Sequence, residues 1–416
     1  MTAQTEGGEF KRGWPVVLSS AVGIGLGLSP LPFYSLGVLA EPLGAEFGWK
    51  QSQIFGGLFV MTIAVLIAGP AVGSLADRYG ARPVALISVL LFGLTFAAFS
   101  QNTGDLSVFY ALWAALGVAG AGTLPITWTR GVNSWFVTHR GLALGLALVA
   151  TGIGGYAATQ IVVAMLKTDG GWRHAYLAVA ALPLLISLPI AYFLFTERPR
   201  GEGASALAAP TIGLTLGQAV LTWRFWVLAA AFVPISLALG GVIPNMVKIL
   251  SSDGIAKEQA YFLYSLIPLT VAIGRVFGGM LIDRLWAPGV AFVMLAAPAL
   301  GLFELSLAGV ADPSIALLGV ILIGVALGVE YDFMAYMVAR YFGMKAYAAI
   351  YGALYGFFAL GAALGPIWYA RMFETAGSYD EALFLGALMT LVGAALLPSL
   401  GRYPEFSAEN PQGREG

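Results

Sequence analysis

The sequence predicts an all-α membrane protein with twelve transmembrane helices in two pseudo-symmetric halves of six helices each. Of its 416 residues, 59% are hydrophobic and only 10% are charged, whereas a soluble domain carries about 25% charged residues. Apolar stretches of about 20 residues or more recur along the chain, which suits spanning helices and is too long for the ~10-residue strands of a barrel. A charged pattern around Asp77 also repeats 206 positions later.

Twelve apolar stretches are separated by polar, charged or turn-forming residues. They cover residues 14–41, 51–76, 82–100, 106–136, 139–166, 172–195, 222–249, 258–283, 287–309, 313–342, 346–373 and 379–400. We expect Pro30 and Pro32 to break the first span, and Pro234 and Pro244 to break the seventh, because proline removes a helix hydrogen bond.

The longest polar gap divides the chain into halves. It begins at Glu197 and is rich in Pro and Gly. We therefore expect an N-terminal six-helix half at 1–196, a cytoplasmic linker at 197–221, a C-terminal half at 222–402 and a polar cytoplasmic tail at 403–416.

Basic residues predict the orientation of the chain. If the N-terminus is inside, the cytoplasmic segments hold thirteen Lys and Arg residues and the outer segments hold six. This excess favours cytoplasmic termini in a multi-pass protein of the cell inner (plasma) membrane. Lys11 and Arg12 precede a long apolar run without a cleavage site, so we interpret it as a spanning helix and not a signal peptide.

Several classes of function are excluded by what the sequence lacks. It has no Cys, no phosphate-binding Walker loop and no metal-ligand cluster, and its two histidines, His139 and His174, lie at predicted membrane edges. We expect no enzymatic activity, no cofactor or metal and no nucleic-acid partner. The lipid bilayer is the expected environment, and the chain is expected to be monomeric.

The stretch Gly73 to Arg82, GSLADRYGAR, lies between the second and third spans. Gly80 supplies a residue that tolerates positive φ in the tight turn between two helices. By itself such a loop could be an ordinary cytoplasmic turn. The 206-residue shift, however, places Asp77 on Asp283 and Arg78 on Arg284. The same shift places Gly73 on Gly279, Phe136 on Phe342 and Gly155 on Gly361; in the second copy, Trp286 and Pro288 replace Gly80 and Arg82.

These motifs resemble those of the major facilitator superfamily, and the 73–82 loop resembles its loop signature. Other stretches resemble the monocarboxylate-porter and oxalate/formate-antiporter-like branch, and the resemblance covers nearly all the transmembrane part. They are Leu39 to Trp49, Ser134 to Gly155, Gly274 to Arg284 and Arg340 to Gly352. The resemblance implies alternating access, a substrate carboxylate bound by Arg275, and a cytoplasmic gate formed by Asp77, Arg78, Arg82, Asp283 and Arg284.

The sequence departs from patterns of the superfamily at three places. Val271 stands where some relatives have an Asp four residues before the arginine, and the eleventh span holds only Arg371, at its outer end, in place of the lysine of oxalate exchangers. Trp113 replaces the fourth-span arginine of drug and sugar transporters. The missing lysine weakens the interpretation as a dicarboxylate exchanger.

Charges inside spans are costly and need a reason, at about 2.5–3.5 kcal/mol each. Arg275 lies eight residues before Asp283, or ~12 Å into the membrane. It could extend to the surface, but its depth favours carboxylate binding through a bidentate guanidinium. Arg130 lies five residues before Trp135, near the end of its span. It has either a structural role or an acidic partner on the tenth span. In the second case it would take part in proton coupling.

Glu330 and Asp332 lie deep in the tenth span. Two residues apart on a helix, they point about 200° from each other and cannot share one task. Each could form an ion pair with Arg130 or Arg275, or could load and release a proton. We expect one of the two, Glu330 more than Asp332, to be the proton-coupling acid.

Aromatic residues complete the candidate site. Tyr34 follows the break in the first span, and Tyr351 and Tyr355 share one face of the eleventh because they are four residues apart. They are either packing residues or substrate contacts. The sequence therefore predicts a secondary active transporter that moves a small organic anion, of the monocarboxylate type, together with protons. The alternatives are an anion antiporter or exporter, or a membrane sensor that does not transport.

Overall fold

The computed structural model describes residues 8–136, 139–197, 212–307, 312–404 and 406. The chain forms two compact helical units, an N-terminal unit, Met1–Gly201, and a C-terminal unit, Glu202–Gly416. In the described residues, 11 helical stretches are long and apolar enough to cross a membrane. The predicted span 14–41 is not among them, because it forms two shorter helices, α1 (Gly8–Gly25) and α2 (Leu31–Phe47).

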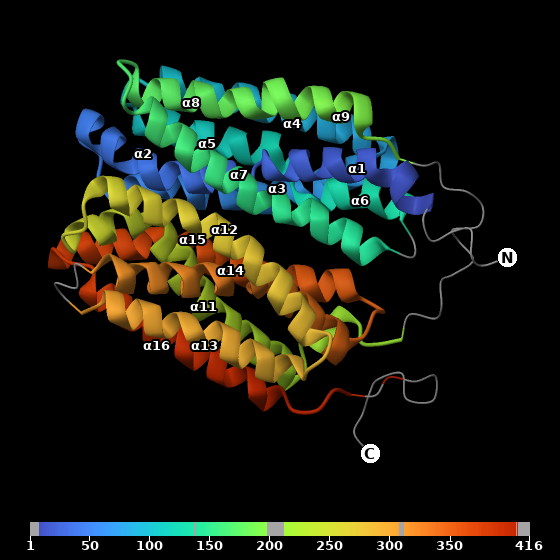
Figure 1. Cartoon of the computed structure of the whole chain (residues 1–416). Coiled ribbons are helices and arrows are strands. Elements are labelled where there is room, and N and C mark those ends of the chain that lie inside the picture. The colour runs from blue at the N-terminus through green and yellow to red at the C-terminus, as the bar shows by residue number, and fades with distance from the viewer. Residues whose placement is uncertain (1–7, 137–138, 198–211, 308–311, 405, 407–416) are drawn as a thin grey trace. The chain divides into compact units, whose positions relative to one another are not determined.

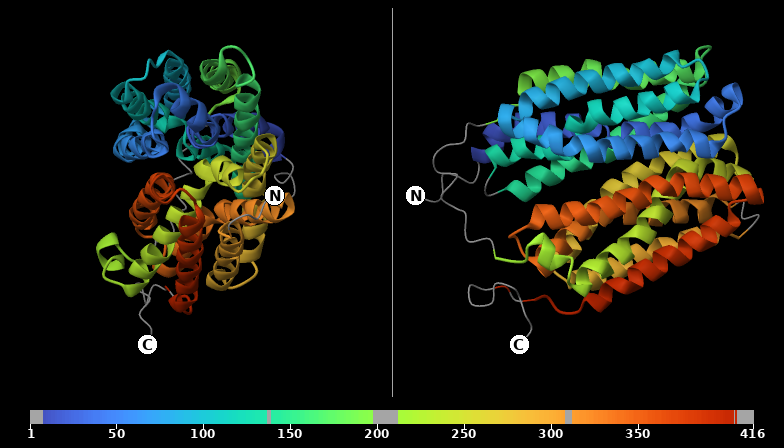
Figure 2. Two further views of the ribbon diagram at one scale, coloured as in Figure 1. Left: turned by 90° about the vertical axis from the view of Figure 1, so that its left-hand side faces the viewer. Right: turned by 180° about the vertical axis from the view of Figure 1, so that it is seen from behind.

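The remaining helices of the N-terminal unit lie side by side with α1 and α2 (Figures 1 and 2). They are α3 (Gln51–Tyr79), α4 (Ala81–Ala98), η1 (Phe99–Gln101), α5 (Leu106–Gly120), η2 (Ala121–Thr123), α6 (Pro125–Trp135), α7 (Arg140–Met165), α8 (Gly171–Leu182), the π turn η3 (Pro183–Ser187) and α9 (Leu188–Leu194). Trp128, Phe136 and Phe195 are fully buried in the core of this unit.

Two interruptions face each other inside the N-terminal unit. The first, between α1 and α2, confirms the expected break at Pro30. The second, between α5 and α6, was not expected: Leu124 precedes Pro125 and is held extended at ψ 156°, as the residue before a proline prefers. Thr123 connects the two interruptions, since its hydroxyl accepts a hydrogen bond from the Leu28 amide at 2.9 Å and donates one to Gly120 O at 2.7 Å.

The C-terminal unit consists of longer, mostly unbroken helices (Figure 1). They are α10 (Leu216–Ala219), α11 (Trp223–Ser252), α12 (Lys257–Ile282), α13 (Ala287–Leu305), α14 (Pro313–Phe342), α15 (Tyr347–Ala376), α16 (Asp380–Leu396) and η4 (Leu397–Leu400). The expected break of the seventh span is wrong, because α11 continues through Pro234 and Pro244. Beside Pro244, the Asn245 amide donates to Gly241 O at 2.9 Å and to Pro366 O at 3.2 Å. The second bond attaches α11 to α15 beside the proline.

The described end of the predicted linker is hydrogen-bonded to the C-terminal unit. The Leu214 amide donates to Phe342 O at 2.8 Å, and the Met344 amide donates to Ile212 O at 3.0 Å. These bonds attach the chain before α10 to the turn between α14 and α15. The part of the predicted linker at 198–211 lies outside the described residues.

The internal repeat is visible in how helices pack within each unit. In the N-terminal unit α7 packs on α1, where a Cβ on Gly154 would overlap Gly25 O. In the C-terminal unit α15 packs on α11, where a Cβ on Gly361 would lie 2.3 Å from Ser236 Oγ. Equivalent pairs therefore touch through small residues, which allow close backbone contact in membrane helices.

The repeated loop differs between its two copies. Gly80 ends α3 and begins α4 with φ at 90°, which confirms the positive φ expected of it. At the equivalent position Trp286 has φ at −66°, because a bulky side chain disfavours the positive region. The helix before it, α12, already ends at Ile282. The degraded second copy is therefore a wider turn.

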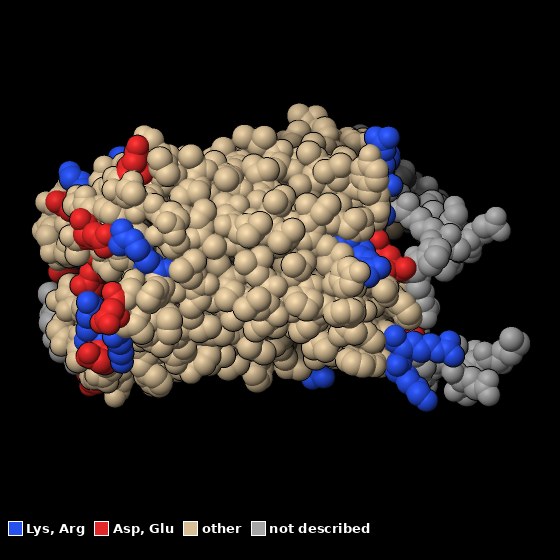
Figure 3. Space-filling view, turned by 90° about the horizontal axis from the view of Figure 1, so that it is seen from above, with Lys and Arg blue, Asp and Glu red and all other residues tan. Residues whose placement is uncertain are grey.

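Charge on the surface follows the expectation for a membrane protein. On the face shown in Figure 3, Lys, Arg, Asp and Glu gather at the two ends, and the broad band between them is almost uncharged. Large apolar side chains are exposed in the spans, for example Ile67 at 74% and Phe193 at 74%. A surface of this kind suits contact with lipid tails.

Candidate functional site

Helices α12 and α14 of the C-terminal unit approach each other closely. A Cβ on Gly274 of α12 would lie 2.2 Å from Val325 O, and one on Gly328 of α14 would lie 2.2 Å from Val271 O. No other residue fits either position without a backbone shift. This contact fixes the register between the two helices and places the charged residues that follow each glycine side by side.

Two of these charged residues, Arg275 of α12 and Asp332 of α14, form an ion pair. Arg275 Nε lies 3.4 Å from Asp332 Oδ2, and the two side chains are 16% and 34% exposed. The sequence had left the partner of Asp332 open between Arg130 and Arg275. The structure pairs it with Arg275 inside the C-terminal unit.

Glu330 has a different environment from Asp332. It is 1% exposed, and among the residues that the structure describes its Oε1 has no hydrogen-bond partner. The two acids therefore have separate surroundings, as their spacing predicted. An ionised carboxylate buried without a cation costs several kcal/mol, so this position suits a group that can bind a proton.

Aromatic rings from α15 lie along the same region. Tyr347, Tyr351, Tyr355 and Phe358 form a row of nearly parallel rings, with neighbouring centroids 5.9, 6.1 and 6.1 Å apart. We call this row the aromatic ladder. Tyr331 of α14 packs on it, with its centroid 6.0 Å from that of Tyr355 and 4.7 Å from that of Phe358.

The aromatic ladder lies beside the helix that carries the two acids. Tyr331, which packs on Tyr355 and Phe358, stands between Glu330 and Asp332 in α14. The structure therefore brings together Arg275, Asp332, Glu330, Tyr351 and Tyr355 of the predicted set. Tyr34 and Arg130 belong to the N-terminal unit, where Tyr34 is buried and its ring meets that of Phe33.

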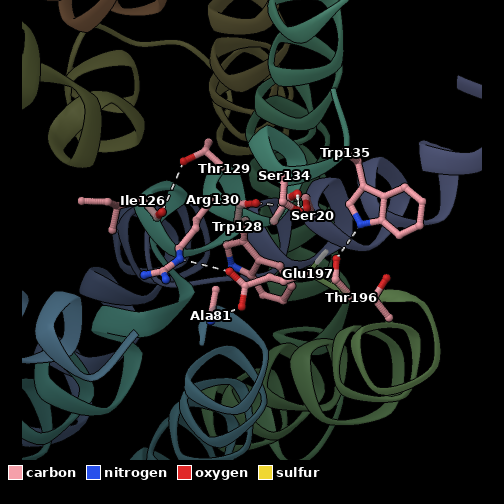
Figure 4. A network of polar contacts seen from close by, with 11 residues as sticks. Ser20, Ala81, Ile126, Trp128, Thr129, Arg130, Ser134, Trp135, Thr196 and Glu197 are labelled. Atoms are coloured by element: carbon pink, nitrogen blue, oxygen red, sulfur yellow. Dashed lines mark hydrogen bonds and ion pairs between the residues drawn. The ribbon is translucent and has the colours of Figure 1, made fainter. Parts of the chain in front are cut away.

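A second polar cluster lies at the Gly80 end of the N-terminal unit (Figure 4). Glu197 Oε1 lies 3.1 Å from Arg130 Nε. Its other oxygen accepts a hydrogen bond from the Ala81 amide at 2.5 Å, at the first residue of α4. A carboxylate there also interacts favourably with the positive end of the helix dipole. We call Glu197, Arg130 and the start of α4 the Glu197 cluster.

Neighbouring groups extend the Glu197 cluster. Arg82 Nη2 donates to Tyr192 O at 2.6 Å, and Trp135 Nε1 donates to Thr196 O at 2.9 Å. These bonds attach the end of α9 and the residues after it to α4 and α6. Sequence reasoning missed the role of Glu197 and placed it in the linker. The available signal was an acid immediately after the sixth span, at the end of the unit where Arg130 and Arg82 lie.

The other predicted gate residues are less informative. Arg78 is exposed, with its guanidinium 5.3 Å from the Tyr79 ring centroid. Asp283 and Arg284 are exposed, and within the described residues neither forms an ion pair. The side chain of Asp77 lies outside the described set. In the described parts of the chain, no group of three or more His, Asp or Glu side chains is placed to hold a metal ion.

Residues 22–366 match the family model of the Major Facilitator Superfamily. The chain is 30% identical to an uncharacterized 38 kDa protein of Thermoproteus tenax, over 88% of this chain and 91% of that one. It is 24% identical to a probable sulfoacetate transporter of Cupriavidus necator, over 92% of both chains. It is also 30% identical to monocarboxylate transporter 11 of Mus musculus, over 66% of this chain and 61% of that one.

The fold is similar to solved structures. The crystal structure of a D-xylose–proton symporter matches with a TM-score of 0.72 at 14% sequence identity, over 97% of this chain and 99% of that one. At this identity the likeness concerns the fold. It confirms the predicted all-α fold.

Proposed function

Because the chain belongs to the Major Facilitator Superfamily and is a multi-pass membrane transporter, we propose that it moves a small organic anion of the monocarboxylate type by proton symport. The transporter class also means that it is not an enzyme. The observation that carries the proposal is the Arg275–Asp332 ion pair at 3.4 Å, which lies inside two membrane spans.

Arg275 supports an anionic substrate. A guanidinium presents a rigid fork that matches a carboxylate with two parallel hydrogen bonds and keeps its charge at any physiological pH. A cation held inside a span is costly unless it serves a ligand or a pathway. Two relatives, by their names a probable sulfoacetate transporter and a monocarboxylate transporter, support an organic anion as the substrate.

The ion pair also supplies a physical basis for proton coupling. A substrate carboxylate and Asp332 compete for the same guanidinium. If a proton neutralises Asp332, Arg275 becomes available to the anion, and the bound anion in turn favours the protonated acid. This is reciprocal linkage between two sites. On this argument Asp332 is the first candidate for the coupling proton.

Glu330, which the sequence alone favoured, is the second candidate. It is fully buried, and among the described residues its Oε1 has no hydrogen-bond partner, so a proton could reach it only when the surrounding helices move. In this role it would respond to the conformational change and not directly to the anion. The two acids can therefore be distinguished. Anion affinity should depend on Asp332, and transport should depend on Glu330.

Alternating access requires the two halves to move, and helix-end charges are suited to hold one state. We place the gate at the Glu197 cluster together with Asp77, Arg78 and Arg82, and at the weaker second copy with Asp283 and Arg284. The excess of basic residues at these loops supports a cytoplasmic location for this end and for both termini, in the cell inner membrane.

The test is uptake into proteoliposomes. Protein reconstituted with an alkaline lumen should accumulate a radiolabelled monocarboxylate such as lactate from a more acidic bath, and a proton ionophore should abolish the accumulation. Arg275→Ala protein, reconstituted at equal density, is the matched control. Binding of carboxylates without flux under any gradient would favour the sensor. Exchange of internal for external anion, without response to the pH gradient, would favour the antiporter or exporter.

A further inference from the structure

The aromatic ladder is not explained by the binding of a small carboxylate alone. Its rings follow one another at positions 347, 351, 355 and 358, spacings of four, four and three that keep them on one face of α15. Eleven residues of helix correspond to ~16 Å, which takes the row from the start of α15 to the depth of the ion pair. A one-carbon to three-carbon acid could touch only a small part of it.

The tyrosines of the ladder differ from ordinary core residues in their exposure. Tyr347, Tyr351 and Tyr355 are only half-buried, so part of each side chain remains accessible. Ring surface is therefore available beside Arg275.

We propose that the substrate is an aromatic carboxylate, whose carboxyl group binds Arg275 while its ring packs on the aromatic ladder at Tyr351 and Tyr355. This inference rests on the proposed function and adds to it the chemical class of the substrate body. Aromatic pairs gain offset or edge contacts beyond the effect of buried area.

A matched pair of ligands isolates the contribution of the ring. Benzoate and cyclohexanecarboxylate carry the same carboxyl group on six-carbon rings, and only the first is aromatic. We would titrate each into purified protein by calorimetry at one pH and compare their dissociation constants. The expected preference for benzoate is about 2- to 10-fold, the range of an aromatic pair contact.

Variants locate the preference. Tyr351→Leu and Tyr355→Leu should bring the ratio of the two dissociation constants close to one, and Tyr351→Phe should keep it. Phe277→Leu, on the same helix as Arg275 and 56% exposed, is the matched control and should leave the ratio unchanged. The ratio is measured within each protein, so a partly unfolded preparation changes the number of sites and not the result.

Three outcomes would overturn the inference. Equal affinity for the two ligands, with both lost in Arg275→Ala, would reject the aromatic substrate and leave the proposed function standing. A preference that persists in both Leu variants would place the ring elsewhere. Absence of binding by either ligand and by lactate would reject the inference and the proposed function together.

Discussion

Arg275 of α12 and Asp332 of α14 lie 3.4 Å apart, Nε to Oδ2, with the aspartate the more exposed of the two side chains. Their meeting depends on Gly274 and Gly328, since a Cβ at either glycine would overlap the facing backbone. An anion that binds Arg275 must therefore replace, or share the guanidinium with, an acid that the protein itself provides.

Arg275→Lys should weaken carboxylate binding although the charge is kept. Lysine is a point charge and cannot form the bidentate contact. The expected cost is about 1.5–3 kcal/mol, the range for a hydrogen bond to a charged group, which is roughly a 10- to 150-fold rise in dissociation constant. Calorimetric titration with benzoate or lactate measures it. Unchanged affinity for every carboxylate tested would remove Arg275 from the site.

Asp332→Asn and Glu330→Gln should separate binding from coupling. Asparagine imitates the protonated acid, so Asp332→Asn should keep or improve anion affinity, remove the pH dependence of that affinity, and permit exchange without uphill uptake. Glu330→Gln should leave the affinity and its pH dependence intact while slowing transport. Binding titrations at several pH values and proteoliposome uptake test both. The opposite pattern would assign the coupling proton to Glu330.

Glu197→Gln should destabilise the N-terminal unit and alter turnover more than substrate affinity. The substitution keeps an acceptor for the Ala81 amide but removes the charge that pairs with Arg130. We expect a loss of about 1–3 kcal/mol of stability, because the pair is only partly exposed. Thermal unfolding in detergent and initial uptake rates are the measurements.

Glu46→Gln is the matched control for Glu197→Gln. Glu46 accepts hydrogen bonds from Trp172 Nε1 at 2.5 Å and Arg173 Nη1 at 2.7 Å, at the opposite end of the same unit. Its substitution should lower thermal stability without a comparable effect on turnover. If both variants slowed transport equally, the effect would reflect stability and the gate assignment would be wrong.

Asp253→Asn should stabilise the protein above about pH 6. Burial, with a further contribution from the charge of Asp380, raises the pKa of the half-buried Asp253 to about 6. A carboxyl whose pKa is raised by folding contributes stability below its unfolded pKa, near 4, and loses it as the pH rises through the folded pKa. With allowance for solvent exposure, we expect the variant to gain about 1–2 kcal/mol at pH 8.

Thermal unfolding of wild type and Asp253→Asn across pH 4–8 tests this prediction. The two curves should meet near pH 4 and separate between pH 4 and 6, with the variant higher. A constant difference at all pH values would indicate a packing effect of the amide. A variant less stable at pH 8 would contradict the sign.

The amino-acid sequence determined most of the fold. Long apolar runs predict membrane helices because lipid offers no partner to an unpaired backbone group. The repeat at 206 positions predicted which elements correspond, and the packing of α7 on α1 and of α15 on α11 follows it. Positive φ at Gly80 was also predictable, because the residue type and the short turn leave few alternatives.

The sequence did not determine how prolines act. Pro30 interrupts a helix as predicted, whereas Pro244 does not. Pro244 lies inside α11, which packs on α15, and the adjacent Asn245 donates to Pro366 O of that helix. Local sequence cannot show whether such partners are present, because they come from distant parts of the chain.

The candidate site was predicted as residue types and depths, and the tertiary structure decided the partners. Arg275, Glu330 and Asp332 stood out because charges in apolar spans are rare. Their assignment to an ion pair and a separate buried acid required the register of α12 on α14, which two glycine contacts set. Likewise, the sequence predicts Glu197 as the first residue of a linker. Only the fold shows that it contacts Arg130 and the start of α4. Charge and hydropathy are properties of the chain itself, but pairing depends on three-dimensional distance, which only the packed helices determine.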